Sequence, residues 1–200
     1  MNLADALKTN FAAASEAKFQ ADVAAGRPPT PIVRYVNIEG PEDTFELVRK
    51  EIRDAAGTFT VMKAAREIVA DIPEREKLAE IIRIGQWSQA HVKYTNDPWG
   101  IETVNSPVWL LHHGHLGWDC DDHTALNGAL LKSLGIRVRP IMGGNEKFGG
   151  WFRKSKIGYV HIWLQAFDPK SGTWVDVDST NKQQPIGWRY PYRFHHFKEA

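Results

Sequence analysis

The chain has 200 residues, of which 42% are hydrophobic and 24% are charged, a composition typical of one ordinary globular domain. Its 25 basic and 24 acidic residues give a net charge of +1, so the composition favours neither a nucleic-acid partner nor a membrane-surface partner. No apolar run approaches the roughly 18 residues of a membrane span. The single cysteine, Cys120, excludes an internal disulfide.

The N-terminal segment is separated from the rest of the chain by a Pro-rich stretch. Residues 1–26 are rich in alanine and predict a helix with a thin apolar face, and they lack the apolar core of a secretory signal. The stretch from Gly26 to Pro31 predicts an extended linker. We therefore expect a helical arm and linker over 1–31, of the kind that orders on a partner, and one domain over 32–200.

Apolar residues at helical spacing predict a run of helices after a short strand at 32–38. The predicted helices span 41–56, 60–70, 75–93 and 107–111. Ser106 followed by Pro107 is typical of a helix start, because serine caps the free N–H groups and proline fits the first helical position.

The centre of the chain changes from helix to strand. Helical spacing over 120–134 ends at Gly135, which suits the left-handed conformation that often closes a helix. Apolar residues then alternate with Arg137 and Arg139, which predicts a strand over 136–140.

The second half continues with strands. A glycine-rich basic loop over 143–156 precedes two predicted strands, 159–167 and 173–178, which a turn over 168–172 joins as a hairpin. Residues 179–200 give no clear prediction. The predicted elements are a run of helices, then a central helix, then antiparallel strands. This order predicts an α+β fold rather than alternating βαβ units.

The residues that point to chemistry are Cys120, His161 and Asp178. A cysteine at a helix N-terminus lies among free N–H groups, which lower the pKa of a thiol and can stabilise an oxyanion. Such a thiol needs a base, and the base needs an orienting acceptor. His161 lies in one strand of the hairpin and Asp178 ends the other, so we expect them to be neighbours. Asp176 shares a face with Asp178, and alternation alone does not separate the two.

Three motifs in this order carry a resemblance to a known family: GWDCDDHTALNGALLKSLGIRVRPIMGG, HIWLQAF and WVDVDST. Together they resemble the transglutaminase-like branch of the papain-like thiol enzymes, and most of all the small versions encoded by tailed bacteriophages and prophages. The resemblance implies that Cys120 is the nucleophile, His161 the base and Asp178 the orienting carboxylate. It also implies a papain-like core with N-terminal helices, a central helix carrying the cysteine, and an antiparallel sheet.

The sequence departs from the family pattern before the cysteine. Trp118 and Asp119 separate Gly117 from Cys120, so the second oxyanion donor is not identifiable. Trp87, Trp99 and Trp109 also precede the cysteine, and none of them matches the family pattern clearly.

Acidic and histidine side chains crowd the cysteine in the sequence. Asp119, Asp121 and Asp122 oppose thiolate formation but suit the first turn of a helix, so we interpret them as structural. Histidines at 112, 113, 115 and 123 raise the question of zinc. Because neither a CxxC nor an HExxH motif is present, we expect no native metal and no cofactor.

The resemblance implies an enzyme that forms a thioester from an amide and passes the acyl group to water or an amine. We expect hydrolysis by a peptidase or amidase whose partner is a peptide or protein amide, such as cell-wall peptide. The alternative is a virion structural protein that keeps the fold as a scaffold, with weak or no catalysis, and docks on phage subunits through residues 1–31. Both hypotheses place the protein in the host cytoplasm or in a phage particle.

Overall fold

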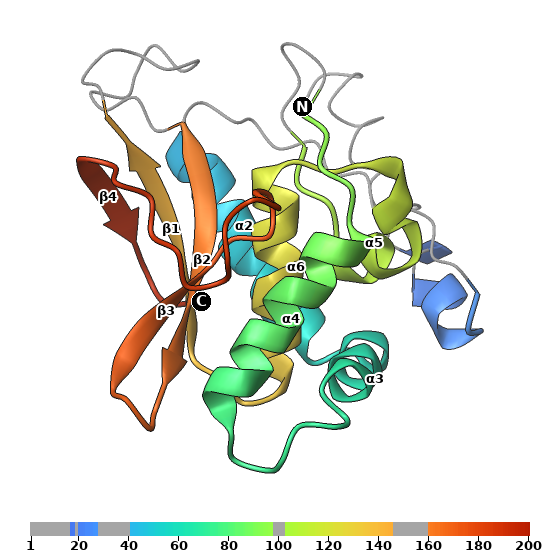
Figure 1. Cartoon of the computed structure of the whole chain (residues 1–200). Coiled ribbons are helices and arrows are strands. Elements are labelled where there is room, and N and C mark those ends of the chain that lie inside the picture. The colour runs from blue at the N-terminus through green and yellow to red at the C-terminus, as the bar shows by residue number, and fades with distance from the viewer. Residues whose placement is uncertain (1–16, 19, 28–40, 98–102, 146–159) are drawn as a thin grey trace, which may run out of the picture.

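The computed structural model describes residues 17–18, 20–27, 41–97, 103–145 and 160–200 (Figure 1). The helices, in chain order, are α2 (Pro41–Ala56), α3 (Phe59–Ile68), α4 (Lys77–His91), α5 (Pro107–His113), the 3-10 turn η1 (Gly114–Leu116) and α6 (Cys120–Ser133). The strands are β1 (Val138–Gly144), β2 (His161–Asp168), β3 (Thr173–Val177) and β4 (Phe194–Phe197).

Helix α6 forms the centre of the molecule, between the sheet and the other helices (Figure 1). It contacts α2, α3, α4 and α5 as well as strands β1 and β2. Every residue from 121 to 131 is buried, so three turns of this helix have no solvent-facing side. Its buried apolar residues are Ala125, Leu126, Ala129, Leu130 and Leu131.

A glycine allows α6 to approach its neighbours closely. A Cβ added at Gly128 would lie 2.5 Å from Cδ1 of Ile52, on α2, and 3.3 Å from Cδ1 of Leu164, on β2. Glycine disfavours a helix interior by about 1 kcal/mol relative to alanine. Here that cost is offset, because Ile52 and Leu164 are fully buried against α6.

The sheet is antiparallel throughout, with strand order β3-β2-β1-β4. Alternate residues of β2, Ile162 and Leu164, belong to the hydrophobic core that α6 shares. His161, Trp163 and Gln165 occupy the other face, as the period of two requires. The sheet thus packs its apolar face on α6 and carries a polar face from which the site is built.

The structure confirms the α+β architecture and the order of helices and strands, including helix 41–56 with the same bounds. Gly135 has φ +76° and closes α6 as predicted. One expectation was wrong in detail: Gly143 and Gly144 belong to strand β1 rather than to a loop. The end of the chain, for which there was no clear prediction, contains β4, which pairs with β1. The predicted strand at 32–38 lies outside the described residues.

The proposed boundary of the N-terminal arm also lies outside the described residues, which include only part of 1–31. Within that part, Val23 packs against the hydrophobic core, and the buried carboxylate of Asp22 accepts hydrogen bonds from Lys18 and Arg27. The division of the chain at residue 31 stays a prediction.

None of the described helices combines the length and the apolar character needed to cross a bilayer.

Replacing Gly128 with valine should destabilise the protein by about 1–3 kcal/mol, because a branched side chain would overlap Ile52 in a filled core. Urea unfolding measures the loss. Gly57→Val is the matched control, since an added Cβ there meets nothing within 4 Å. Equal losses in the two variants would contradict close packing at Gly128.

Candidate active site

Cys120 is the first residue of α6, and Asp119 caps the helix. The Asp119 backbone is extended (φ −92°, ψ −162°), and its Oδ1 accepts a hydrogen bond of 3.3 Å from the N–H of Asp121. A short acceptor side chain thus satisfies one of the free N–H groups of the first turn. Cys120 itself is half-buried. The predicted position of the thiol at a helix N-terminus is confirmed.

The chain that leads into Cys120 is held against the segment after α4. The N–H of Trp118 donates to the carbonyl of Lys93 at 2.9 Å, and the N–H of Thr95 donates to the carbonyl of Trp118 at 3.0 Å. Gly117 has φ +103°, and a Cβ added there would lie 2.2 Å from Oγ1 of Thr95, so only glycine fits. These contacts fix the direction in which α6 begins.

His161 and Asp178 are in direct contact. His161 begins β2, and Asp178 directly follows β3, its antiparallel neighbour. Nε2 of His161 lies 2.8 Å from Oδ2 of Asp178, and only 11% and 7% of these side chains are exposed. The structure therefore brings these two predicted site residues together.

Asp178 is held in its ionised form. Burial acts to raise the pKa of this carboxyl, but the hydrogen bond and charge of His161, with donors from Thr180 and Tyr190, lower it to about 2. The N–H and the hydroxyl of Thr180 donate to Oδ1 at 2.9 and 2.7 Å. Asp178 therefore stays negative near neutral pH and can orient the ring of His161 and stabilise its protonated form.

A chain of buried hydrogen bonds anchors the residue after Asp178 to α6. The hydroxyl of Ser179 lies 2.7 Å from Nδ1 of His123 and accepts a hydrogen bond of 2.8 Å from the amide of Asn127. Asn127 in turn accepts from the hydroxyl of Ser88 at 2.6 Å. Burial lowers the pKa of His123 to about 4, so this histidine is neutral at pH 7.

Asp176, the other aspartate of β3, contacts different groups. Its Oδ1 accepts hydrogen bonds from the indole of Trp163 at 2.8 Å and from the amide of Gln165 at 2.9 Å. The ring of Trp163 stacks beside that of His161, with centroids 5.8 Å apart and an interplanar angle of 15°. Of the two aspartates that the sequence left open, Asp178 is the one that contacts His161.

One hydroxyl joins the Cys120 end of α6 to the His161 end of β2. Oγ1 of Thr124 lies 2.7 Å from the carbonyl oxygen of Cys120 and 3.2 Å from that of Ile162, the residue after His161. The Thr124 side chain therefore links the backbone at Cys120 to the backbone next to His161. This places the two predicted reactive groups at the same end of the α6–β2 packing.

The charges of Cys120 and the nearby aspartates influence the phenols of Tyr94 and Tyr192. Burial, and then the negative charges of Cys120 and the nearby aspartates, raise the pKa of Tyr94 to about 12. Burial and the charges of Asp178 and Cys120 raise the pKa of Tyr192. Both phenols therefore lie within electrostatic reach of the thiol and stay protonated at neutral pH.

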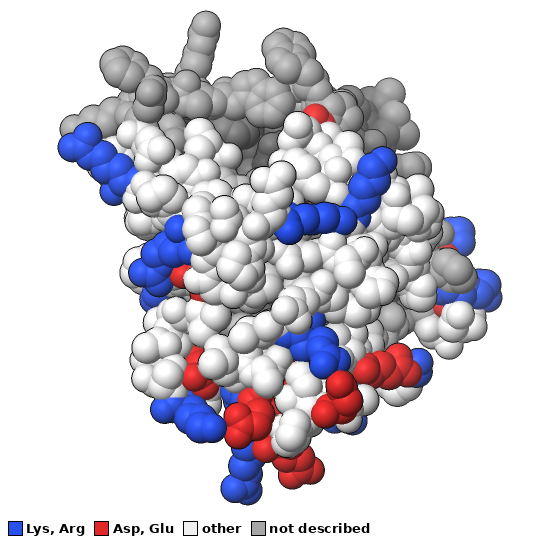
Figure 2. All heavy atoms as spheres, in the orientation of Figure 1, with Lys and Arg blue, Asp and Glu red and all other residues white. Residues whose placement is uncertain are grey.

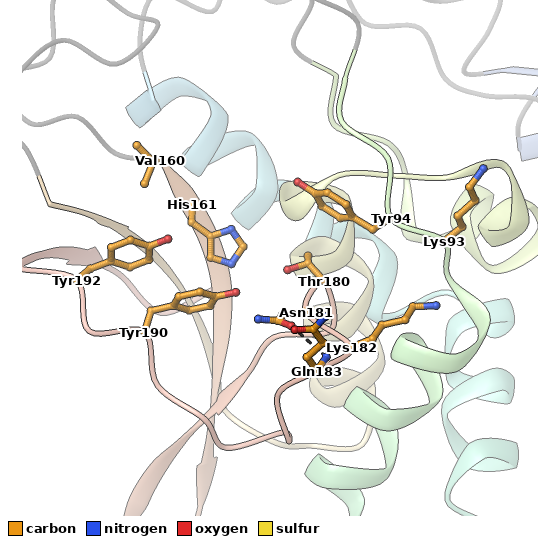
Figure 3. Close-up of a pocket in the computed structure, with 10 residues that line it drawn as sticks. All are labelled: Lys93, Tyr94, Val160, His161, Thr180, Asn181, Lys182, Gln183, Tyr190 and Tyr192. Carbon is orange, nitrogen blue, oxygen red and sulfur yellow. Dashed lines mark hydrogen bonds between the residues drawn. The ribbon is translucent and has the colours of Figure 1, made fainter.

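A cleft of about 590 Å³ opens beside His161 (Figure 3). Figure 3 shows Tyr190 and Tyr192 on one side of the imidazole and Tyr94 on the other, with Lys182 farther along the cleft. The lining residues are Lys93, Tyr94, Val160, His161, Thr180, Asn181, Lys182, Gln183, Tyr190 and Tyr192. On this face of the molecule, acidic side chains gather mainly toward the end where α4 begins (Figure 2).

The aromatic wall of the cleft was not predicted from the sequence. Tyr190 and Tyr192 lie in the segment that showed no periodicity, and the only visible signal was a pair of tyrosines around Pro191. Gly143 makes room for them, since a Cβ added there would lie 2.6 Å from Cδ2 of Tyr192 and 2.8 Å from the ring of Trp163.

Two of the aspartates near Cys120, Asp121 and Asp122, have strongly raised pKa values. Burial raises the pKa of Asp121 well above its usual range, and the neighbouring Asp119 raises it further. Burial also raises the pKa of Asp122, although its carboxylate accepts hydrogen bonds from the backbone N–H of Asn105 at 2.6 Å and from the Asn105 amide at 3.1 Å. The latter contacts tie the first turn of α6 to the segment before α5.

The tryptophans that precede Cys120 do not line the cleft where the structure describes them. Trp87 stacks on His91, and Trp109 stacks on His113 with ring centroids 3.5 Å apart. Trp99 lies outside the described residues. Trp87 and Trp109 therefore pack against neighbouring histidines and do not line the cleft beside His161.

Comparison with known families agrees with the motifs. Residues 63–179, more than half of the chain, match the family model of the transglutaminase-like superfamily. A search of curated protein sequences finds no match to the chain.

Several solved structures are similar to this chain at low identity. A candidate cysteine protease from Cytophaga hutchinsonii is 16% identical with a TM-score of 0.46, over 84% of this chain and 58% of that one. A candidate protease from Parabacteroides distasonis is 9% identical with a TM-score of 0.50, over 80% and 36%. Calcium-bound LapG from Legionella pneumophila is 15% identical with a TM-score of 0.46, over 69% and 75%. The chain thus spans less than two thirds of the first two proteins, and identities this low concern the fold alone.

Replacing Asp178 with asparagine should lower the free energy of unfolding at pH 7 by on the order of 2 kcal/mol. The pKa of about 2 lies below the usual 3.8, so the ionised carboxylate stabilises the fold above about pH 4, and this contribution is lost as the pH falls through 2. Urea unfolding of both proteins between pH 7 and 2.5 measures the difference. A difference that stays constant below pH 4 would contradict an ionised Asp178.

Proposed function

Because the chain belongs to the transglutaminase-like superfamily, we propose that it is a thiol hydrolase that cleaves an amide bond with Cys120, His161 and Asp178. The observation that carries the proposal is the 2.8 Å contact between His161 and Asp178 at the end of β2 that Thr124 ties to the carbonyl of Cys120. A nucleophile at a helix N-terminus, a base and an orienting carboxylate are the three parts of a thiol-enzyme site.

In the proposed mechanism, His161 takes the proton of the Cys120 thiol, and the thiolate attacks the amide carbonyl carbon. The resulting oxyanion is stabilised by N–H groups of the first turn of α6. The C–N bond then breaks as His161 returns the proton to the leaving amine, which leaves a thioester on Cys120. Water, deprotonated by His161, attacks the thioester, and the carboxylic acid and the free thiol are released. Asp178 stabilises the imidazolium in both half-reactions.

The cleft supports a peptide as the substrate. It is an open groove with tyrosine rings on both sides of His161 and polar groups from residues 180–183 along its floor. Aromatic walls with scattered donors and acceptors suit an extended peptide backbone. We propose hydrolysis rather than transfer to an amine, with cell-wall peptide as the substrate class that the family resemblance favours.

The place of action belongs to the same proposal. The Cys120-Asp121-Asp122 motif supports an enzyme encoded by a phage or prophage, acting in the host cytoplasm or as part of a particle. Docking on particle subunits through residues 1–31 stays a prediction. A purely structural role without catalysis is the alternative, and the reactivity of the thiol distinguishes the two.

Cys120 should react with iodoacetamide well below pH 8.5, about the pKa of a free thiol. His161→Ala should slow the reaction at pH 6 by about tenfold or more, because the thiolate loses its imidazolium partner. Mass spectrometry reads the rate directly, since Cys120 is the only cysteine. His91→Ala, an exposed histidine outside the cleft, is the control. Identical pH profiles in the wild type and His161→Ala would contradict the pairing.

Incubation with peptides from bacterial cell walls should yield two fragments whose masses add up to that of the peptide plus one water, and an added amine should not be incorporated. Cys120→Ala should abolish the cleavage, and Asp178→Asn should slow it by about 10²–10⁴-fold, as loss of an orienting carboxylate does in comparable sites. Incorporation of the added amine would show a transferase instead. A chain that neither labels at Cys120 nor cleaves any peptide would favour the structural role.

A further inference from the structure

The charges that line the cleft beside His161 are of one sign. Among the described residues, the lining contains two lysines, Lys93 and Lys182, and no aspartate or glutamate. Figure 3 shows both lysines on the same side of the imidazole as Tyr94. On this face of the molecule the acidic side chains gather elsewhere, toward the end where α4 begins (Figure 2). A chain with a net charge of only +1 thus carries two positive charges along its cleft.

The ammonium groups of these two lysines are not used by the fold. Neither Lys93 nor Lys182 forms an ion pair or a side-chain hydrogen bond within the described part of the chain. Every other lysine in that part contacts a carboxylate or a backbone oxygen. Both cleft lysines are exposed, so water solvates them and they are available to a charged ligand.

The backbone at Lys93 is fixed next to the segment that leads into Cys120. The N–H of Lys93 donates to the carbonyl of Gly114 at 2.9 Å, and its carbonyl accepts from the N–H of Trp118 at 2.9 Å. Its Cδ lies 3.6 Å from the position of a Cβ added at Gly117, so the aliphatic part of the side chain runs along that segment. The ammonium group therefore extends from a rigid position beside the proposed nucleophile.

The backbone at Lys182 is tied to α4. The carbonyl of the preceding residue, Asn181, accepts a hydrogen bond of 3.1 Å from the side-chain amide of Gln89. Burial lowers the pKa of His123, and the positive charge of Lys182 acts in the same direction. Lys182 therefore lies within electrostatic reach of the buried hydrogen bonds next to Asp178.

The ligand group that fits two free ammonium groups in a peptide cleft is a carboxylate. A lysine side chain is a flexible point charge that favours an anion, and charge complementarity of this kind contributes mainly to specificity. The anionic groups of an unmodified peptide are its C-terminal carboxylate and the side chains of aspartate and glutamate. The two lysines thus favour acidic peptides over neutral or basic ones.

We propose that Lys93 and Lys182 form a subsite for a carboxylate of the substrate, so that the cleft prefers peptides with a free carboxylate within a few residues of the scissile amide. This inference rests on the proposed function and names the class of peptide that the same cleft takes. An exposed ion pair in water is weak, so we expect a preference of about threefold to tenfold from the two lysines together. The preference should decrease as salt screens the charges.

The first test compares two reagents that differ in charge. Iodoacetate and iodoacetamide alkylate a thiol by the same displacement of iodide, so the ratio of their rates at Cys120 reports the potential in the cleft without a known substrate. The full-length chain is labelled with each reagent at pH 7, in about 0.01 M and about 0.5 M salt. Mass spectrometry gives both rates, since Cys120 is the only cysteine.

The double variant Lys93→Gln/Lys182→Gln should lower the ratio of the iodoacetate rate to the iodoacetamide rate by about threefold to tenfold at low salt, and by less at high salt. The carboxylates at the start of α6 act equally in both proteins, so the change in the ratio reports the lysines alone. Lys170→Gln is the control, because Lys170 is an exposed lysine outside the cleft. Circular dichroism checks the fold.

The second test does not depend on catalysis. The Cys120→Ala variant is titrated with two blocked tripeptides, acetyl-Ala-Glu-Ala-amide and acetyl-Ala-Gln-Ala-amide, which have almost the same shape and differ by one negative charge. Chemical shifts in the nuclear magnetic resonance spectrum give the two affinities. The glutamate peptide should bind at least about threefold more tightly, and the lysine double substitution should remove this difference.

The subsite is overturned if the double variant leaves the rate ratio at low salt unchanged, or if the two peptides bind the folded Cys120→Ala variant equally. It is also overturned if Lys170→Gln lowers the ratio as much as the double variant does, which would show a general effect of surface charge. If Cys120 reacts with neither reagent, the proposed catalysis fails, and the comparison of the two peptides alone decides the subsite.

Discussion

The burial of the first turns of α6 is the constraint on which the site depends. This helix is enclosed by the other helices on one side and by the sheet on the other, and its N-terminal end lies against the end where β2 begins. Thr124 fixes this meeting point, because its hydroxyl contacts the carbonyls of Cys120 and Ile162. Packing inside the core therefore decides where the thiol lies, before any contact between the side chains of the proposed site is considered.

The same burial explains why the surroundings of the site are polar yet ordered. A buried polar group costs free energy unless it is hydrogen-bonded, and the chain from Ser88 through Asn127 and Ser179 to His123 meets this requirement. These bonds cross between α4, α6 and the segment after β3. They hold the backbone next to Asp178 in place without contacting its side chain. The geometry of the His161–Asp178 contact therefore depends on hydrogen bonds inside the core.

Much of this could be predicted from the sequence, because the signals were local. The helix starting at Cys120, its end at Gly135 and the strand pair that carries His161 all follow from periodicity and capping. The segment after Asp178 could not be predicted, since Tyr190 and Tyr192 take their positions from tertiary contacts with β1 and β2 and not from any repeat. Strand β4 has only four residues, too few for a pattern.

The two aspartates of the WVDVDST motif show how tertiary contacts decide what a pattern leaves open. Asp176 lies within strand β3, paired with Gln165 of β2. Its buried carboxylate accepts hydrogen bonds from Trp163, Gln165 and Arg189. Asp178 lies beyond the last paired residue, where the chain is free to turn toward His161. Because Trp163 stacks beside His161, Asp176 still supports the imidazole through that ring. Two aspartates on one face thus help to position His161. Asp178 contacts the imidazole directly, and Asp176 holds the ring of Trp163, which packs beside the imidazole.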